Sequence, residues 1–600
     1  MKRPVSELIV TLSSAVMLLI VIWPADSQQA ALANSGDSAF DGSLKEGLVG
    51  YWKLRGDCRD YSGFGNHGQN HGVKLNSGAF DGRSAYIEVP NSDSLKLGAR
   101  DFSLCAWVYT EKEVDDIVGD IFYMYDPALR RGITLSIDSS GGGYQAQGTD
   151  RHIHFGIDNA RLSDWIDCGR PNPQSNYVSN SLTVYNGSLY AASAGAADPK
   201  DWCHVYRYDG GEKWVDCGRV GEGRTTGVMP LTVHDGRLYA ATGTIDWTRV
   251  GSGDYDAGSV YRYVGGTQWD DCGQPSDNRT LTSLASYRGK LYCASGPTSP
   301  GIFVLSGTRE WTPSKMFMKN DPHRLFPHSM CRYDGRLYAA FPGAFAFDGR
   351  DWTFVGDPVP FVKKSPSLQT HSMTIYEGKL HAGTWPDAVV SVYEGGEHWR
   401  ESGRVGVDGT EVNSLAVYNG KLYGGSLPRA EVCRFDGDSK WTSLKRFSPD
   451  NWGPVPADRA CGAQVKEWCR ATSLTVFDGK LFVSTGSCTS SVLDAPLDLR
   501  GKVFSMEAGK VASFDRDLGS GWKHVSAVRN NGRLKLFVDG QLVAESAQFD
   551  PGEYDVSTDR PLRIGFGQTD NFAGKMSDVH VYSRALREAE IQELSDNAPE

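Results

Sequence analysis

One phrase of about twelve residues recurs seven times between residues 181 and 485 of this 600-residue chain. Each copy alternates apolar and polar residues, reaches an Asn-Gly, Asp-Gly or similar turn, and continues as a second strand, which is the pattern of a β-hairpin. The copies begin at Ser181, Pro230, Ser283, Ser329, Ser372, Ser414 and Ser473. A looser second hairpin follows most copies, with a Trp at the start of its last strand, as in the segments from Val205, Val260, Ser391 and Val432.

Two hairpins make a four-stranded unit. The units repeat roughly every 42 to 59 residues, which is within the range of β-propeller blades. A blade cannot bury its faces alone, so stacked copies are expected to close into a ring. Glycine at the turns and Trp late in each unit resemble kelch-type propellers, although the regular Gly-Gly doublet of that family is missing. We predict a kelch-like propeller of about seven blades over residues 161–508, with an eight-bladed or an open ring as the alternatives.

The two ends of the array indicate how the ring closes. Trp165–Gly169 reads as an outer strand with no blade before it, and Val503–Met506 reads as a third strand. We expect these two segments to pair in the last blade, because a strand from the start of the array that joins the last blade closes the ring.

Segments on both sides of the array carry strand motifs of a second kind. They include GLVGYWKL from Gly47, DYSGFGNHG from Asp60, FSLCAWVYT from Phe102, LKLFVDGQLV from Leu534 and GKMSDVHVYSRALREAEI from Gly574. In this order they resemble a laminin-G-like, concanavalin A-like jelly roll of about 200 residues, which is one domain. The fold expected is therefore all-β: a discontinuous jelly-roll sandwich of residues 44–160 and 501–596, interrupted by the propeller.

The N-terminal segment predicts export. Lys2 and Arg3 precede an apolar run from Leu8 to Trp23, which is typical of a secretory signal peptide over residues 1–30, with an uncleaved membrane anchor as the alternative. Residues 31–43 read as a flexible tether. We expect a secreted, periplasmic or cell-surface protein that touches a membrane only through such an anchor.

Twelve cysteines in an exported chain predict some disulfide bonds. Cys461 and Cys469 are the best local pair. Cys168, Cys217 and Cys272 occupy equivalent positions on the outer strands of separate blades. These strands are too far apart for the geometry of a disulfide, so the three cysteines are not expected to pair with one another.

The charge balance and the motifs exclude several functions. A net charge of −11 without a basic stripe argues against nucleic-acid binding. The sequence lacks a nucleophile elbow, a zincin helix, a phosphate loop and the signature motifs of laminarinase-like and sialidase-type hydrolases. Most acidic residues fall in turns, as in Asp235-Gly236. No catalytic residue is therefore predicted.

One position in each inner strand is a candidate for ligand binding. Two residues before the Leu or Met of each inner strand stand Asn180, Met229, Thr282, His328, His371, Asn413 and Thr472, and six of these seven are polar. We expect the polar six to line the mouth of the central channel, where His328 and His371 from adjacent blades could converge on one ligand or ion. The alternative is a ring that holds channel water and caps strand ends.

A structural calcium ion is implied by the jelly-roll resemblance, since that family often holds Ca²⁺ on oxygen ligands. Asp578 in the SDVHVY phrase is similar to the Asp that supplies such a ligand, and Asp60 and Asn66 are weaker candidates. The alternative for all three is a turn stabilised by bonds between side chains and backbone.

Taken together, these features predict an exported, non-catalytic protein that binds a glycan or a cell-surface protein. The resemblance implies adhesion or carbohydrate binding, and Trp202, Trp247, Trp385 and Trp452 lie between strand phrases where a ring could stack on sugar. The rival hypothesis is a polysaccharide hydrolase or lyase that works in the propeller channel. The enzyme hypothesis predicts an acidic pair or a Tyr/His/Arg cluster in the channel, with strongly perturbed pKa values.

Overall fold

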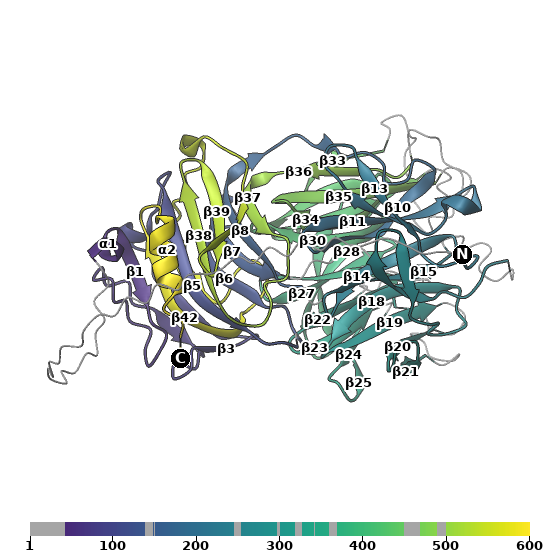
Figure 1. The fold of residues 1–600 in the computed structure, drawn as a ribbon, viewed down its shortest axis with the longest axis horizontal. Coiled ribbons are helices and arrows are strands. Elements are labelled where there is room, and N and C mark those ends of the chain that lie inside the picture. The colour runs from purple at the N-terminus through teal and green to yellow at the C-terminus, as the bar shows by residue number, and fades with distance from the viewer. Residues whose placement is uncertain are drawn as a thin grey trace, which may run out of the picture.

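The computed structural model describes residues 42–113, 115–138, 148, 150–244, 254–296, 300–317, 327–340, 343–358, 369–448, 468–488 and 500–599. They form two all-β bodies side by side, a sandwich and a propeller (Figure 1). Purple and yellow segments meet in the sandwich, so both ends of the sequence build it, whereas the middle of the chain builds the propeller. The discontinuous fold expected from the sequence is therefore confirmed.

Two seven-stranded antiparallel sheets form the sandwich. The first sheet contains, in order, β1 (Leu48–Trp52), β42 (Ala573–Tyr582), β5 (Phe102–Thr110), β38 (Gly521–Asn530), β39 (Arg533–Val538) and β40 (Gln541–Glu545), with β3 (Ala79–Asp81) beside β42. The second contains β2 (Gln69–His71), β4 (Tyr86–Val89), β41 (Leu562–Ile564), β6 (Gly119–Asp126), β7 (Arg131–Asp138), β8 (His152–Leu162) and β37 (Ala508–Phe514).

The sandwich core follows the two-residue period of its strands. Phe102, Leu104, Ala106 and Val108 of β5 all point into the space between the sheets, as the alternation in the sequence predicts. Short helices α1 (Gly42–Lys45) and α2 (Glu588–Ser595) lie against the outer face of the first sheet, where Ile591 packs in a second apolar cluster.

Seven four-stranded blades form the propeller in the described part of the chain. From the inner to the outer strand, blade 1 contains β10 (Ser175–Tyr185), β11 (Ser188–Ala196), β12 (His204–Tyr208) and β13 (Trp214–Arg219). Blade 2 contains β14 (Gly227–His234), β15 (Arg237–Gly243), β16 (Val260–Gly265) and β17 (Gln268–Asp271). Blade 3 contains β18 (Thr280–Tyr287), β19 (Lys290–Gly296), β20 (Gly301–Leu305) and β21 (Trp311–Met316).

Blades 4 to 6 continue the ring, and blade 7 completes it. Blade 4 contains β22 (Ser329–Tyr333), β23 (Arg336–Ala340), β24 (Ala344–Phe347) and β25 (Trp352–Phe354), and blade 5 contains β26 (Gln369–Tyr376), β27 (Lys379–Trp385), β28 (Val389–Gly395) and β29 (His398–Arg404). Blade 6 contains β30 (Glu411–Tyr418), β31 (Lys421–Leu427), β32 (Glu431–Gly437) and β33 (Lys440–Arg446). Blade 7 contains β34 (Trp468–Phe477), β35 (Lys480–Cys488), β36 (Val503–Met506) and β9 (Ile166–Asp167).

Blade 7 takes its outer strand from the start of the array. Phe504 and Ser505 of β36 pair antiparallel with Asp167 and Ile166 of β9, the arrangement expected from the sequence. The chain then passes from β36 in the propeller to β37 in the sandwich at Glu507. The first and last strands of the ring are thus neighbours, which lets a whole propeller be inserted between two strands of another domain.

The Trp at the start of the outer strands joins one blade to the previous one. Trp214, Trp269 and Trp311 donate their indole N–H to the carbonyls of Cys168, Cys217 and Cys272 at 2.8, 3.0 and 2.9 Å. Trp399 and Trp441 make the same bond to Val355 and Ser402, each at 2.8 Å. An indole N–H that is partly buried needs an acceptor, and the repeated bond satisfies this need at these five blade boundaries.

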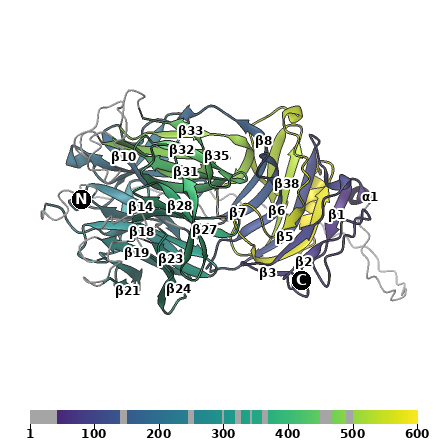
Figure 2. The same ribbon diagram turned by 180° about the vertical axis from the view of Figure 1, so that it is seen from behind.

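The sandwich covers one end of the propeller (Figure 2). The inner hairpin turns of the blades donate backbone N–H groups to it: Gly335 to Asp116 Oδ2 (2.8 Å), Gly378 to the carbonyl of Thr569 (2.9 Å) and Gly479 to Ser513 Oγ (2.9 Å). Asn419 donates from Nδ2 to the carbonyls of Ile157 (2.9 Å) and Ala508 (2.7 Å). This contact buries part of the outer face of the second sheet.

The disulfide prediction is wrong for the described cysteines. Each one whose side chain the structure describes is free, and all are buried except the half-buried Cys58: Cys58, Cys105, Cys168, Cys203, Cys217, Cys272, Cys293, Cys331, Cys433 and Cys469. The buried ones pack as small apolar residues in the sandwich and in separate blades of the propeller. Cys469 is free and packs in an apolar cluster of β34 and its neighbours, and its predicted partner Cys461 lies outside the described residues.

Residues 1–41, which carry the predicted signal peptide and most of the predicted tether, lie outside the described part of the chain. Among the residues that are described, no helix has the length and apolar character needed to span a membrane.

Candidate functional site

The six predicted channel residues lie near the start of the inner strands β18, β26 and β30, just before β22, and in the middle of the longer inner strands β10 and β34. Each inner strand starts at the end of the channel away from the sandwich, here called the distal mouth, and runs to a turn on the sandwich. Ladder register shifts occur between Thr370 and Ser372, Val412 and Ser414, Ala471 and Ser473, and Leu281 and Ser283. His371, Asn413, Thr472 and Thr282 are therefore bulge residues, and a bulge re-aims the side chain of its extra residue.

Four successive blades bring a polar cluster together at the distal mouth. The rings of His328, just before β22, and His371 stack with centroids 4.6 Å apart and planes 24° apart. His371 Nδ1 lies 3.2 Å from Glu411 Oε1, and Arg470 Nη2 donates to Glu411 Oε2 at 3.3 Å. Asn413 Nδ2 donates to Glu411 Oε1. We call His328, His371, Glu411, Asn413 and Arg470 the distal cluster.

Burial controls the charge of the distal cluster. His328, His371 and Glu411 each expose at most 3% of their surface. Burial holds the pKa of both histidines well below the ordinary value, and the positive charge of Arg470 lowers it further. The neighbouring His371 also lowers the pKa of His328, whereas the negative charge of Glu411 opposes this shift. The imidazoles are therefore neutral at pH 7, while Glu411 and Arg470 compensate each other.

Two of the predicted residues have a capping role instead. Thr472 Oγ1 donates to the carbonyl of Val178 at 2.9 Å and lies 2.8 Å from Ser484 Oγ. Thr282 Oγ1 donates to the carbonyl of Pro327. Both bonds join neighbouring blades, as the strand-capping alternative expects. Asn180 lies in β10 at a further register shift, between Val178 and Leu182, and its side chain is outside the described set.

Sequence reasoning missed Glu411 and Arg470, although a signal for both exists. Each stands two residues before a predicted position, Asn413 and Thr472. Residues two apart in a strand share a face, so a step of two toward the N-terminus would have found them. The pattern could not show that the carboxylate and the guanidinium meet, because they belong to different blades.

The predicted calcium ligands serve the protein's own hydrogen bonds. Asp60 Oδ1 accepts from the N–H groups of Tyr51 (2.9 Å) and Ser62 (2.8 Å), and its Oδ2 accepts from Asn66 N (2.9 Å). Asp578 accepts from the hydroxyl of Tyr51 at 2.9 Å and lies 3.6 Å from Arg55.

The Asn66 side chain also has protein partners. Its Nδ2 donates to the carbonyl of Val49 at 2.7 Å, and its Oδ1 accepts from Ser92 Oγ at 2.6 Å. Within the described residues, no group of three or more His, Cys, Asp or Glu side chains is arranged to hold a metal ion. The turn-stabilising alternative accounts for the observed bonds of Asp60, Asn66 and Asp578, and calcium binding stays a prediction.

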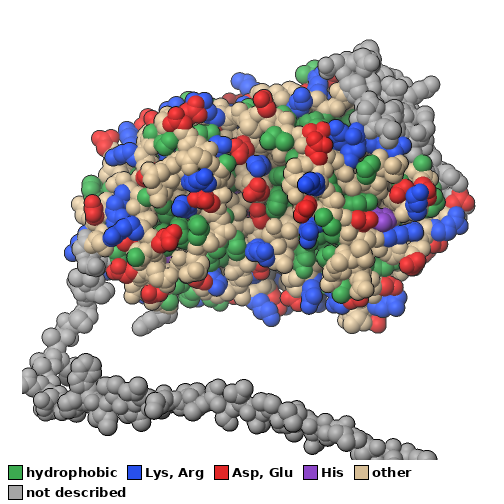
Figure 3. All heavy atoms as spheres, turned by 45° about the horizontal axis from the view of Figure 1, so that its top comes forward, with side chains coloured by type: hydrophobic (Ala, Val, Ile, Leu, Met, Phe, Trp, Pro, Cys, Tyr) green, Lys and Arg blue, Asp and Glu red, His purple; other side chains and the backbone are tan. Residues whose placement is uncertain are grey.

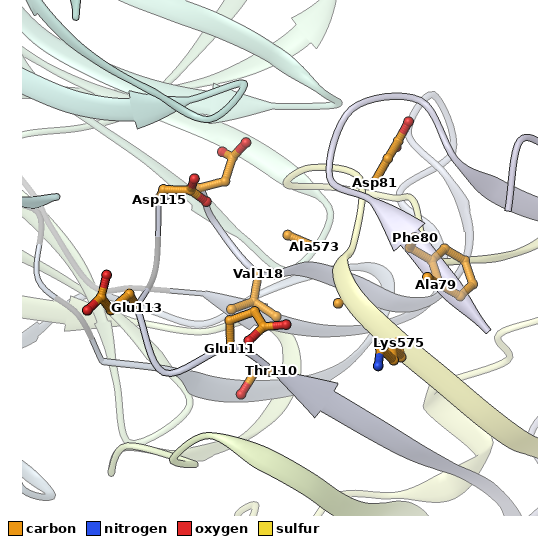
Figure 4. Close-up of a pocket in the computed structure, with 12 residues that line it drawn as sticks. Ala79, Phe80, Asp81, Thr110, Glu111, Glu113, Asp115, Val118, Ala573 and Lys575 are labelled. Carbon is orange, nitrogen blue, oxygen red and sulfur yellow. The ribbon is translucent and has the colours of Figure 1, made fainter. Parts of the chain in front are cut away.

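An acidic cleft of about 270 Å³ lies where the sandwich meets blades 3 and 4 (Figure 4). Glu111, Glu113 and Asp115 stand on the loop after β5, opposite Phe80 and Lys575. Asp115 pairs with Arg288 of blade 3 at 3.6 Å. This carboxylate and the Asp116–Gly335 bond thus hold the two domains together.

The tryptophans expected to stack on sugar are only partly described. Trp202 is half-buried, and its indole N–H donates to the carbonyl of Ala196 at 2.7 Å, so it packs down its own loop. Trp385 is the half-buried last residue of β27. Trp247 and Trp452 lie outside the described residues.

Comparison with known proteins finds one family model that matches part of the chain and several solved structures of low similarity. The family described as the Concanavalin A-like lectin/glucanases superfamily matches residues 465–592, which run from blade 7 to the end of the sandwich. No curated protein matches the chain. Similar solved structures include virginiamycin B lyase from Staphylococcus aureus (10% identity, 58% of this chain and 99% of that chain, TM-score 0.39) and Trypanosoma rangeli sialidase (12%, 74% and 94%, 0.27). At these identities, the likeness concerns the fold alone.

Proposed function

We propose that this protein is exported and binds carbohydrate at the distal mouth of its propeller. One observation carries the proposal: His328, His371, Glu411 and Arg470, from four successive blades, meet in a buried cluster. Burying such charges costs free energy. The cluster lies at the mouth away from the sandwich and its described bonds join successive blades, which supports a ligand-binding role at this mouth.

The class of ligand follows from the chemistry of the cluster and from the sandwich. Carboxylate, guanidinium, amide and neutral imidazole groups are donors and acceptors suited to the hydroxyls of a sugar. The match to a superfamily described by lectins and glucanases agrees with a glycan. Acidic and basic side chains are interspersed over the face seen in Figure 3, which gives no extended field for a polyanion.

A second candidate function is a polysaccharide hydrolase or lyase with its active site at the same mouth. The observation that favours it is the pair His371 and Glu411, with Nδ1 3.2 Å from the carboxylate oxygen. A carboxylate beside Nδ1 favours the tautomer with the proton on Nδ1, which makes Nε2 the basic nitrogen. A neutral, oriented imidazole is the form that removes a proton from a substrate.

A polysaccharide panel scored for both retention and product release tests the two functions. We expect the full chain to retain at least one polysaccharide, and the His328→Ala/His371→Ala double variant to lose retention while it stays folded. Release of reducing ends or unsaturated products, lowered about 100-fold or more by Glu411→Gln, would establish catalysis.

The matched control is Met229→Leu, which alters the equivalent inner-strand position in blade 2, outside the distal cluster, by a swap that nearly conserves volume. It should retain the polysaccharide as the unaltered chain does. Undiminished retention by the double histidine variant would contradict the proposal.

A further inference from the structure

We propose that a cleft between the sandwich and blade 5 is a second binding site, which takes one pyranose ring of a neutral glycan. The cleft has a volume of about 280 Å³, and its walls include Tyr123, Tyr125, Phe566, Arg560, Arg563 and Glu377. A space of this size is at the lower end of ligand pockets, so it suits one sugar ring. The inference takes only its ligand class from the proposed function and concerns a different part of the molecule.

The sandwich supplies aromatic rings to this cleft. Tyr123 and Tyr125 alternate along β6 with Phe122 and Met124, which face the core, so the two tyrosines lie on the outer face of the second sheet. Their ring centroids are 6.0 Å apart, and the Tyr125 hydroxyl donates to Asp158 Oδ2 at 2.9 Å. Tyr123 and Tyr125 are buried, with 6% and 1% of their surface exposed, and form the floor of the cleft. Phe566, which follows β41, is half-buried, so its ring is the aromatic surface that a ligand can reach. Such an aromatic face is suited to the apolar C–H face of a sugar ring.

Two arginines of the sandwich add hydrogen-bond donors. Arg563 stands directly opposite Tyr123 across the sheet, and its Nε donates to Glu88 Oε2 at 3.1 Å. Arg560 donates from Nε to Asp126 Oδ2 at 3.1 Å. The bonds described for both side chains use Nε, so the terminal nitrogens remain for ligand hydroxyls. A planar guanidinium held in this way is well suited to bind two neighbouring oxygens.

The propeller supplies the acceptor. Glu377 is the first residue of the blade 5 turn, with φ 49°, and its N–H donates to the carbonyl of Gln568 at 3.0 Å. The Glu377 side chain is exposed. Partial desolvation raises the pKa of its carboxyl, while a hydrogen bond with Tyr376 and the charges of Lys421 and the two arginines oppose that rise. No ion pair among the described residues joins Glu377 to Arg560 or Arg563, although all three line the cleft. The cleft is therefore complete only when both domains are present.

The balance of charge points to a neutral sugar. Arg560 and Arg563 are matched by Asp126 and Glu88, and Glu377 adds a further negative charge. An acidic sugar would thus meet no unpaired positive charge. Hydroxyl groups, in contrast, can donate to Glu377 and accept from the arginines at the same time.

The test uses the full chain and three neutral trisaccharides, of α-linked glucose, β-linked glucose and β-linked galactose, in titration calorimetry. We expect at least one to bind, and Glu377→Gln and Arg560→Gln each to weaken its binding about tenfold or more. Asp235→Asn is the matched control, because Asp235 has the same left-handed place in the blade 2 turn, with φ 46°, and is exposed. It should leave the affinity unchanged.

The outcomes separate this site from the distal mouth. The cleft proposal is overturned if none of the trisaccharides binds, or if the Glu377 and Arg560 variants bind like the unaltered chain. Loss of trisaccharide binding in His328→Ala/His371→Ala, with the cleft variants unaffected, would also overturn it and would leave the proposed function standing. Loss in the cleft variants alone supports the cleft.

Discussion

The two ends of the propeller channel both bury charged groups, but they do so for different reasons. At the sandwich end, Arg332 of β22 is fully buried and donates to the carbonyls of Ser286 (2.6 Å) and Gly148 (2.7 Å). Gly148 belongs to the sandwich, in the link between β7 and β8, so this arginine binds the two domains together. At the distal mouth, the described bonds of Glu411 and Arg470 stay within the propeller.

This difference shows which buried charges need a functional explanation. At the sandwich end, backbone groups of one domain satisfy side chains of the other, and the gain is a fixed domain arrangement. The distal cluster places neutral histidines beside an ion pair, and its described bonds join blades of the propeller. Perturbed groups of this kind gather at functional sites.

The two ends also differ in their response to pH. Burial raises the pKa of Asp116 and Asp120 to about 7 and that of Asp150 to about 8, all near the sandwich end. A raised carboxyl pKa stabilises the fold at low pH, and this contribution falls as the pH rises toward 7 to 8. The lowered pKa of His328 and His371 does the opposite: its contribution is complete above about pH 6.5 and is lost as the pH falls.

The largest expected effect is at the sandwich end. Arg332→Met leaves the carbonyls of Gly148 and Ser286 without their donor and removes the positive charge near Asp116 and Asp150. We expect the free energy of unfolding, measured by denaturant titration, to fall by about 3–5 kcal/mol. Arg350→Met, at an exposed turn of blade 4, should change it by less than about 0.5 kcal/mol. Equal effects of the two variants would remove the distinction between the ends.

The second largest expected effect is a change in how steeply the free energy of unfolding varies with pH. Each neutral buried histidine makes the free energy of unfolding fall by about 1.4 kcal/mol per pH unit below pH 6.5, down to its folded pKa. His328→Asn/His371→Asn should therefore flatten the acid limb by about 2.7 kcal/mol per unit, measured by denaturant titration from pH 7 to 5. Asp150→Asn should act oppositely, because it removes the loss of stability that the unaltered chain shows as the pH rises from 5 to 8.

The smallest effect concerns the blade boundaries between the two ends. Trp269→Phe removes the indole bond to the Cys217 carbonyl, and Trp441→Phe removes the equivalent bond to Ser402. We expect each to lower the free energy of unfolding by about 1 kcal/mol, and by similar amounts. Trp352 donates instead to Ser314 Oγ at 3.0 Å, a hydroxyl that can turn to another partner, so Trp352→Phe should cost less. A larger loss at Trp352 than at Trp269 would contradict this account.

Much of the architecture could be predicted because its signals are local. The hairpins of the repeat show in the alternation and turn residues around Asn186-Gly187 and Asp478-Gly479, and the borrowed strand β9 shows in a phrase without a blade. The disulfide prediction failed because cysteine content and the expected export say nothing of which strand each thiol occupies.

The candidate site divides in the same way. By itself, the sequence determined that a polar residue stands near the start of most inner strands, since strand period and repeat alignment are properties of a short segment. Only the tertiary structure decided that His328, His371 and Asn413 join Glu411 and Arg470, while Thr282 and Thr472 cap neighbouring blades. Ring closure sets which blades are neighbours, and the sandwich sets which channel end is covered. Both depend on contacts between residues far apart in the chain, which no local pattern records.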